Sequence, residues 1–237
     1  MAAITLDMSL GGDGKFHDQV YDRLSEALIQ GQIPPLKAIS LRSLAQELGV
    51  SPMPVREAVR RLIAEKALEL QPANKRLRVP NLSEHRVTQL IMARQWVEPE
   101  LAYLAAKRMT RDGIKRLKED DIKLMKALKT GDVSVYMQAN HDFHFTIYRA
   151  ADADLLCDMA RMLWLQSGPF MRVVFGRLGT VQLPKDHHQD MIQAFEAGDA
   201  DAVKASMAED IREGMDLMFE AIRAQSEPEP KRRRKGA

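Results

Sequence analysis

Near the start of the chain, apolar side chains recur at the spacing of a helix. Phe16, Val20, Leu24 and Leu28 are each four residues apart, which predicts one apolar helix face. Gly31 and the sequence QIPP come next, and residues of this kind stop helices. We therefore expect the first helix to end near Gly31.

A second helix is predicted after Ser40. Its apolar positions fall on a single face, at Leu41, Leu44, Ala45 and Leu48. Gly49 follows them directly, and glycine readily takes the left-handed conformation that ends many helices. The chain is then expected to turn within about three residues, because a new helix start comes so soon.

The third helix is predicted to begin abruptly at Ser51. Serine is a good N-cap, and Pro52 and Pro54 suit a first turn, where a missing N–H is harmless. The residues expected to point inward are Val55, Ala58, Val59 and Leu62. The residues expected to point outward are Ser51, Met53, Arg56 and Arg60.

Two helices joined by a tight turn that contains glycine form a helix-turn-helix. In that motif the second helix enters the DNA major groove by its N-terminal end. Arg56 and Arg60 would then face DNA. The pattern alone leaves a second interpretation open, in which both arginines form a solvated face paired with Glu57.

A short hairpin is predicted directly after these helices. The segments LEL (68–70) and LRV (77–79) alternate apolar and polar residues on either side of the turn-rich sequence PANK. The side chains expected to face the core are Leu68, Leu70, Leu77 and Val79. Lys75, Arg76 and Arg78 would lie near the tip, where they could reach a phosphate or the minor groove. Helix-turn-helix and hairpin together predict a winged helix.

Beyond a linker at residues 80–83, the pattern is helical throughout. Ser83 is the expected N-cap of a helix whose buried residues are Val87, Leu90, Ile91, Val97, Leu101, Leu104 and Ala105. Arg94 and Glu98 share that face, four residues apart, so they form either a structural ion pair or a pair in which Arg94 also contacts a ligand. Further helices are predicted at residues 114–128, 133–151, 155–166, 170–175, 186–197 and 200–224.

Polar residues interrupt the apolar faces of three of these helices. Asn140 and His144 are in register with apolar neighbours, His188 shares a face with methionine and isoleucine, and Asp210 lies between apolar residues. A single inward histidine is usually a hydrogen-bonded core residue. Three helices that each contribute a ligand-type residue favour a converged site. His141 and His187 fall off these faces and are expected at the surface, while Trp96 and Trp164 are expected in packing roles.

The composition fits this organisation. The chain has 237 residues and is 45% hydrophobic, which allows two modest domains. No apolar run approaches the roughly 18 to 20 residues of a membrane span, and the N-terminus lacks the features of a signal peptide. The single Cys157 excludes an intrachain disulfide and is expected in the core. We therefore expect a cytoplasmic protein without membrane contact.

Charge divides the chain further. Residues 1–80 hold 11 Lys and Arg against 9 Asp and Glu, residues 81–225 hold 19 against 22, and residues 226–237 hold 5 against 2. A basic surface within the helix-turn-helix is what a phosphate backbone requires. We expect a mainly α protein with a disordered N-terminus (1–14), a winged helix-turn-helix DNA-binding domain (15–80), an all-α domain (81–225) and a basic disordered tail (226–237).

The segment LRSLAQELGVSPMPVREAVRRLIAEKALEL resembles the winged-helix domain of GntR-type bacterial transcription regulators. The leucine-alanine helix, GVS and PVREA carry the resemblance, which covers about residues 16 to 80. It implies DNA contacts by Arg42, Ser51 and Arg56, with assistance from Asn74 and Lys75 in the wing. With the exposed positions identified above, the candidate DNA-binding residues are Arg42, Ser51, Met53, Arg56, Arg60, Asn74, Lys75 and Arg76. Leu36 occupies a position that is usually glycine in this family.

The second half resembles the all-helical FCD effector domain of the FadR-type branch of the same family. The matching stretches are RQWVEPELAYLAA, NHDFHFTIYRAADADLL and the spacing from His188 to Gly198-Asp199. The resemblance implies a divalent metal and a small organic acid bound beside it. By position, the metal ligands are Asn140, His144, His188 and Asp210, where many members have one aspartate and three histidines. One carboxylate and two imidazoles suit zinc, nickel or manganese, with Asn140 a weak fourth ligand. The alternative is a metal-free polar pocket.

These features predict a ligand-responsive transcription regulator, a repressor that binds a near-palindromic operator as a homodimer. Its effector site would comprise Arg94, Asn140, His144, His188 and Asp210. A second hypothesis is a metal-dependent enzyme on a helical bundle with an accessory DNA-binding domain, and a third is an architectural DNA-binding protein. The sequence shows no phosphate loop and no Ser/His/Asp arrangement, so we do not expect an enzyme.

Overall fold

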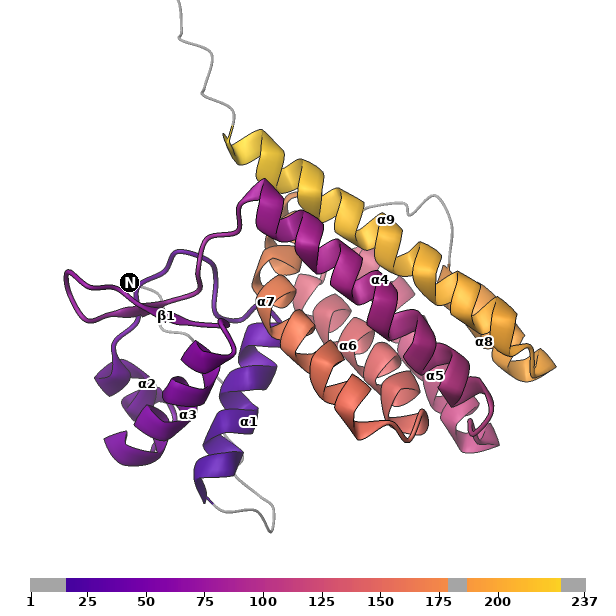
Figure 1. Cartoon of the computed structure of the whole chain (residues 1–237), viewed down its shortest axis with the longest axis horizontal. Helices are drawn as coiled ribbons and strands as arrows, with labels where there is room; N and C mark the ends of the chain where they lie inside the picture. Colours follow the sequence, from indigo (N-terminus) through magenta and orange to yellow (C-terminus); the bar gives the residue numbers. More distant parts are fainter. Residues whose placement is uncertain (1–15, 179–186, 227–237) are drawn as a thin grey trace, which may run out of the picture.

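The structure is a computed structural model that describes residues 16–178 and 187–226. The first elements are α1 (Phe16–Ile29), α2 (Leu41–Glu47), α3 (Pro52–Ala64), β1 (Glu69–Leu70) and β2 (Leu77–Arg78). The remaining helices are α4 (Glu84–Ala106), α5 (Arg111–Thr130), α6 (Val133–Ala150), α7 (Asp154–Leu178), α8 (His187–Ala197) and α9 (Ala200–Ser226). Figure 1 shows α1–α3 and the hairpin at one end of the molecule and the bundle α4–α9 at the other. The predicted mainly α fold with a small hairpin is confirmed. The predicted termini at 1–14 and 226–237 lie outside the described residues, except for Ser226.

Local signals in the sequence account for the helix-turn-helix. Ser40 caps α2 by accepting a hydrogen bond from the Ser43 backbone N–H at 3.0 Å. Gly49 takes the left-handed conformation with φ of 61°. Ser51 holds the N-cap position of α3, but its side chain makes no capping hydrogen bond, and Pro52 begins the helix. The inward residues of α3 are all buried, as predicted: Val55, Ala58, Val59 and Leu62.

The hairpin pairs Glu69 with Arg78 and Leu70 with Leu77. Leu77 also pairs with Ile39 on its other side, so β2 is the middle segment and β1 an edge. Of the four side chains predicted to face the core, Leu68, Leu77 and Val79 are buried. The prediction is wrong for Leu70, which is 44% exposed because it lies at the edge beside the wing loop, where no other segment of residues 16–178 or 187–226 covers it.

The helical bundle has α4 and α9 side by side along most of their length (Figure 1). Arg111–Thr130 and Val133–Ala150 pack as a neighbouring pair, α5 and α6. Ser83 caps α4 as predicted, by accepting from the Arg86 backbone N–H at 3.2 Å. Among the described helices, none combines the length and apolar character needed to cross a bilayer.

One helix prediction is wrong in an informative way. The sequence predicts a break between residues 166 and 170, but α7 runs continuously through Pro169. Proline removes one backbone N–H, and a bend or a local adjustment usually compensates. Here every residue from 163 to 170 is buried, so both faces of the helix are covered by packing, which outweighs the local penalty.

Three single side chains also differ from their predictions. Trp96 is 68% exposed rather than packed, whereas Trp164 is buried as expected. His141 is buried and stacks on Phe145 with ring centroids 4.4 Å apart. The side chain of His187 is only 10% exposed, because it points into the bundle from the first residue of α8.

The winged-helix part contacts α7 of the bundle through α1 and the C-terminal end of α3. Arg161 donates to the Tyr21 hydroxyl at 2.9 Å, and Gln166 donates to the Glu65 carbonyl at 3.2 Å. Gly168 lies directly against the Ile29 carbonyl at the end of α1, where a Cβ atom would overlap it. Only glycine permits this approach.

Candidate metal site and DNA-binding surface

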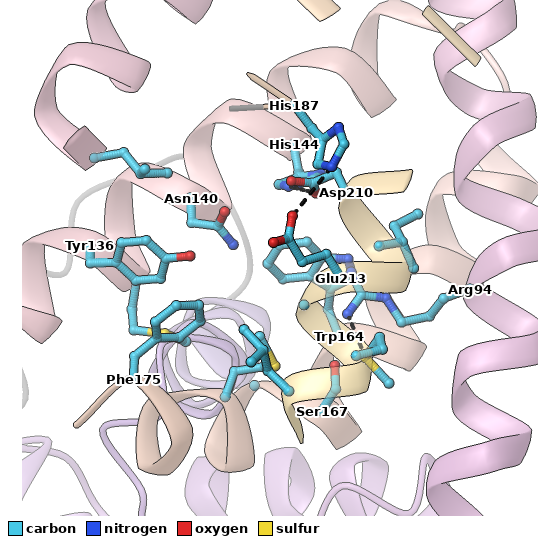
Figure 2. A pocket seen from close by; sticks show the side chains of 18 of the residues that line it. Arg94, Tyr136, Asn140, His144, Trp164, Ser167, Phe175, His187, Asp210 and Glu213 are labelled. Atoms are coloured by element: carbon cyan, nitrogen blue, oxygen red, sulfur yellow. Dashed lines mark hydrogen bonds and ion pairs between the residues drawn. The ribbon is translucent and has the colours of Figure 1, made fainter. Parts of the chain in front are cut away.

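Three ligand-type side chains from three helices meet inside the bundle. His144 comes from α6, His188 from α8 and Asp210 from α9, and one ligand atom of each lies within 4.8 Å of the other two. Asp210 lies between the two imidazoles: His144 Nε2 is 3.2 Å from Oδ2 and His188 Nε2 is 3.4 Å from Oδ1. Figure 2 shows His144 and Asp210 together at one wall of the cavity.

Neighbouring groups determine how the His144 imidazole is oriented. The Tyr148 hydroxyl donates its proton to Glu98 Oε2 at 2.5 Å. The Tyr148 oxygen therefore accepts from His144 Nδ1, 3.1 Å away. This places the proton on Nδ1 and leaves the Nε2 lone pair facing Asp210.

His188 has a similar arrangement on its outer side. Its Nδ1 lies 3.7 Å from Oδ1 of Asp121, a carboxylate of α5 that is 2% exposed. The other oxygen of Asp121 accepts from Gln189 Nε2 at 2.5 Å. An imidazole between a buried carboxylate and a metal is a common arrangement in metal sites. Asp121 could not be identified from the sequence, because only the packing of α5 against α8 brings it to His188.

The pKa shifts favour coordination by the same groups. Burial raises the pKa of Asp210, but His188 and then His144 lower it by more, so that it lies well below its usual range. Burial lowers the pKa of His144 below its usual 6.5, and the negative charge of the adjacent Asp210 offsets only part of this effect. At neutral pH the carboxylate is therefore ionised and the His144 imidazole is neutral. One carboxylate and two imidazoles that converge in this way fit zinc, nickel or manganese.

Asn140 lies one turn before His144 on α6 and lines the same cavity (Figure 2). Its amide is neutral, so it fits a weak contact to a bound metal, water or acid better than a firm ligand. The cluster of charged and imidazole ligands does not depend on it.

The predicted ion pair between Arg94 and Glu98 is present and buried. Arg94 donates from Nε to Oε1 at 2.5 Å and from Nη2 to Oε2 at 2.9 Å. Trp164 donates to the same carboxylate at 3.2 Å and lies under the guanidinium, 4.8 Å from its ring centroid. Burial lowers the pKa of Arg94, but Glu98 raises it by more, so Arg94 remains charged. Arg94 also lines the cavity.

The cavity between these groups measures about 60 Å³. Two of its polar lining residues were not identified from the sequence: His187, which was predicted at the surface, and Glu213. His187 Nε2 lies 3.3 Å from Glu213 Oε2. Glu213 follows Asp210 by three residues on α9, so the helical repeat could have revealed it. The opposite wall holds Tyr136 and Phe175, with ring centroids 4.2 Å apart (Figure 2).

The candidate DNA-binding residues are all exposed on the winged-helix part: Arg42, Ser51, Met53, Arg56, Arg60, Asn74, Lys75 and Arg76. Arg60 makes the alternative pairing that the sequence left open, with Glu57 at 3.0 Å. In the wing, the Asn74 side chain accepts from the Arg76 backbone N–H at 3.0 Å, and Lys75 is left-handed with φ of 54°. The turn therefore holds the three wing residues together at an exposed tip.

Comparison with known proteins matches both parts of the chain. Residues 16–74 match the family described as bacterial regulatory proteins, gntR family, and residues 89–213 match the FCD domain. The HTH-type transcriptional regulator McbR of Escherichia coli is 26% identical over 204 residues, covering 85% of this chain and 92% of its own length. The probable D-xylose utilization operon transcriptional repressor of Paenarthrobacter nicotinovorans is 26% identical, covering 80% of this chain and 82% of its own. The solved structure of Escherichia coli McbR has a TM-score of 0.80 at 26% identity and covers 88% of this chain and 99% of that one.

Proposed function

Since this chain belongs to the GntR family of bacterial regulatory proteins, in the branch with an FCD domain, we propose that it is a ligand-responsive transcription regulator. Its relatives are transcriptional regulators or repressors. Members of this family are not enzymes, so the hypothesis of a metal-dependent enzyme is not retained. The architectural hypothesis leaves the interior His144, His188 and Asp210 cluster without a purpose.

In this proposal, residues 15–80 bind operator DNA through α3 and the wing. The exposed N-terminal end of α3 enters the major groove, where Arg56 and its outward neighbours meet bases and phosphates. Asn74, Lys75 and Arg76 contact the adjacent backbone or minor groove. The protein acts in the cytoplasm as a homodimer, because a helix-turn-helix of this size usually reads two half-sites of a near-palindrome.

The helical domain, residues 81–225, would hold one divalent metal through His144, His188 and Asp210. The single observation that carries this part is the convergence of these three groups at the wall of a cavity. When bound, the metal supplies positive charge for the carboxylate of a small organic acid. Asn140 and Arg94 would orient that acid from neighbouring positions.

Effector binding and DNA binding are then coupled through the arrangement of the two domains. The effector can change the DNA affinity only by as much as its own affinity differs between two such arrangements. As a repressor, the protein would bind its operator in the absence of the effector and release it in its presence. The direct contact between α1 and α7 gives the two parts a shared boundary through which such a preference could act.

The DNA-binding proposal is tested by Arg56→Ala, after the operator has been selected from genomic fragments. We expect a loss of about 1–3 kcal/mol of specific binding, as for one good groove or backbone contact. Arg116→Ala is the control, since Arg116 is an exposed arginine of α5 far along the chain from the winged helix. Unchanged operator affinity of the Arg56 variant would exclude α3 as the recognition helix.

The metal proposal is tested by elemental analysis of protein purified without chelator or histidine tag, followed by addition of zinc, nickel or manganese. Replacing His144, His188 or Asp210 by alanine should each reduce affinity at least about tenfold, because a site with three protein ligands has no spare one. Asn140→Ala should have a much smaller effect. Wild-type protein that binds none of the three metals would leave a metal-free pocket as the correct interpretation.

A further inference from the structure

The charges around the cavity point to a more specific class of effector. Its lining includes one guanidinium group, that of Arg94, and two carboxylates, those of Asp210 and Glu213. The charge of Arg94 is already offset by Glu98, which accepts two hydrogen bonds from it in a buried pair. Asp210 and Glu213 thus place two negative charges at the cavity wall, and the buried Asp121 behind His188 adds a third. One divalent metal would balance two of these three charges.

This balance sets a condition on any ligand that enters. Buried net charge is unfavourable in a low-dielectric interior unless it is paired. A simple monocarboxylate would add a further negative charge to a site where the metal leaves no positive charge in excess. A ligand that carries both a carboxylate and an ammonium group would add no net charge.

Glu213 is placed to receive that ammonium group. It lies one turn beyond Asp210 on α9, and Figure 2 shows its carboxylate directed toward the cavity, between Asp210 and Arg94. Its side chain lines the cavity and is largely enclosed, with 23% of its surface exposed. Its contact with His187, at 3.3 Å, involves Oε2. A carboxylate has four lone-pair sites, so Glu213 retains capacity to accept from a ligand.

The rest of the lining is apolar and is suited to a hydrocarbon side chain. Tyr136 and Phe175 form one wall, and further apolar contacts come from Leu124, Met137, Met171 and Leu217. Methionine side chains adapt to ligands of different shape. The cavity therefore offers a carboxylate position beside the metal ligands, an ammonium position at Glu213 and an apolar wall.

We propose that the effector is a zwitterionic α-amino acid with an apolar side chain, whose ammonium group binds Glu213 while its carboxylate lies at the His144, His188 and Asp210 cluster. This inference rests on the proposed function, because it assumes that the cavity is the effector site. It assigns Glu213 a specificity role. In the competing explanation, Glu213 only pairs with His187 and stabilises α8 against α9.

The test compares matched pairs of compounds that differ only in the α-amino group. They are alanine with propanoate, leucine with 4-methylpentanoate, and phenylalanine with 3-phenylpropanoate. Binding to the zinc-loaded full chain is measured by calorimetry, and the zinc content is checked afterwards because free amino acids can extract metal. We expect the amino acid of at least one pair to bind roughly tenfold or more tightly than its partner, as for one charge-assisted hydrogen bond.

Glu213→Gln separates the two roles. It should reduce the affinity for the preferred amino acid by roughly tenfold or more and leave the affinity for the amine-free partner unchanged or higher. Glu209→Gln is the matched control: it makes the same change one turn earlier on α9, where Glu209 pairs with Arg212 and does not line the cavity. It should behave like wild type.

Three results would overturn the inference. If the amine-free acids bind the wild-type protein with the same affinity as the amino acids, and also release operator DNA, the amino-acid assignment is refuted while the proposed function stands. Equal weakening of both members of a pair by Glu213→Gln would indicate a structural role for Glu213. If no compound of any pair binds a chain that holds zinc and binds operator, the amino-acid assignment is wrong, although metal and DNA binding remain. The wild-type comparison needs no variant, so a variant that fails to fold does not remove the test.

Discussion

Replacing Asp121 by asparagine should weaken zinc binding without unfolding the protein. Asp121 does not reach the proposed metal position; it lies behind His188, with Oδ1 3.7 Å from Nδ1. Its negative charge favours a proton on Nδ1 and so makes the Nε2 lone pair available to the metal. Asparagine has nearly the same size but no charge, and its amide can turn either its oxygen or its NH₂ group toward the imidazole.

The expected magnitude follows from the distance. Carboxylates behind a ligating histidine typically change metal affinity by about 10- to 100-fold. The separation of 3.7 Å exceeds the usual range of about 2.7–3.2 Å for a hydrogen bond, which places this contact at the weak end. We expect a loss of about tenfold, which corresponds to about 1.4 kcal/mol.

Asp120 provides a matched control in the neighbouring position. It is also buried, at 4% exposure, but it pairs with Lys123 at 2.8 Å instead of with a histidine. Zinc affinity is measured for wild type, Asp121→Asn and Asp120→Asn by competition with a chromogenic chelator, and the melting temperature of each metal-free protein is measured in parallel. Equal zinc affinity in all three proteins, or an equal loss in both variants, would refute the role assigned to Asp121.

Three further predictions concern pH and backbone geometry. Because burial holds the pKa of His144 below 6.5, its imidazole remains neutral to lower pH than a free imidazole does. Zinc uptake should therefore be half-maximal below pH 6.5. A midpoint of zinc uptake above pH 6.5 would contradict this prediction. Leu36 is 55% exposed and has a left-handed φ of 64°, so Leu36→Gly should relieve about 1 kcal/mol of backbone strain. Because glycine loses more conformational entropy on folding, the melting temperature should be equal or only slightly higher. A clear drop would show that the Leu36 side chain stabilises the fold. Gly168→Ala should lower the free energy of unfolding by about 1–3 kcal/mol, because the new Cβ would overlap the Ile29 carbonyl. Gly214→Ala on α9, where a Cβ would have ordinary contacts, should not lower it. Denaturant unfolding of both variants measures the two changes.

The helices of the winged-helix part could be predicted because each has its own local signal. Ser40 caps α2, Gly49 ends it in the left-handed conformation, and the proline at the start of α3 fixes a helical φ. None of these features depends on distant residues. The exposure of Leu70 could not be predicted in the same way, because it depends on which strand of the hairpin receives Ile39 as a neighbour.

In the bundle, the apolar repeat located His144, His188 and Asp210 on inward faces, and the structure brings these three side chains together. Their role as metal ligands stays a prediction. The repeat gave no sign of Asp121, because that residue reaches His188 only through the packing of one helix against another. It failed at Pro169 for a related reason: contacts on both sides of α7 keep the helix continuous where the local sequence favours a break.

The contact between Gly168 and Ile29 has a practical consequence for the design of biosensors from this chain. Gly168 lines the cavity, and the Ile29 carbonyl touches the same residue, so a single thickness of backbone forms the wall between them. Gly168 itself has no side chain that could absorb a displacement. Variant libraries intended to change which compound is sensed should therefore vary cavity residues of α6 and α9 and keep Gly168 fixed. A larger residue at position 168 would change how the winged-helix part fits against the bundle before any compound is added.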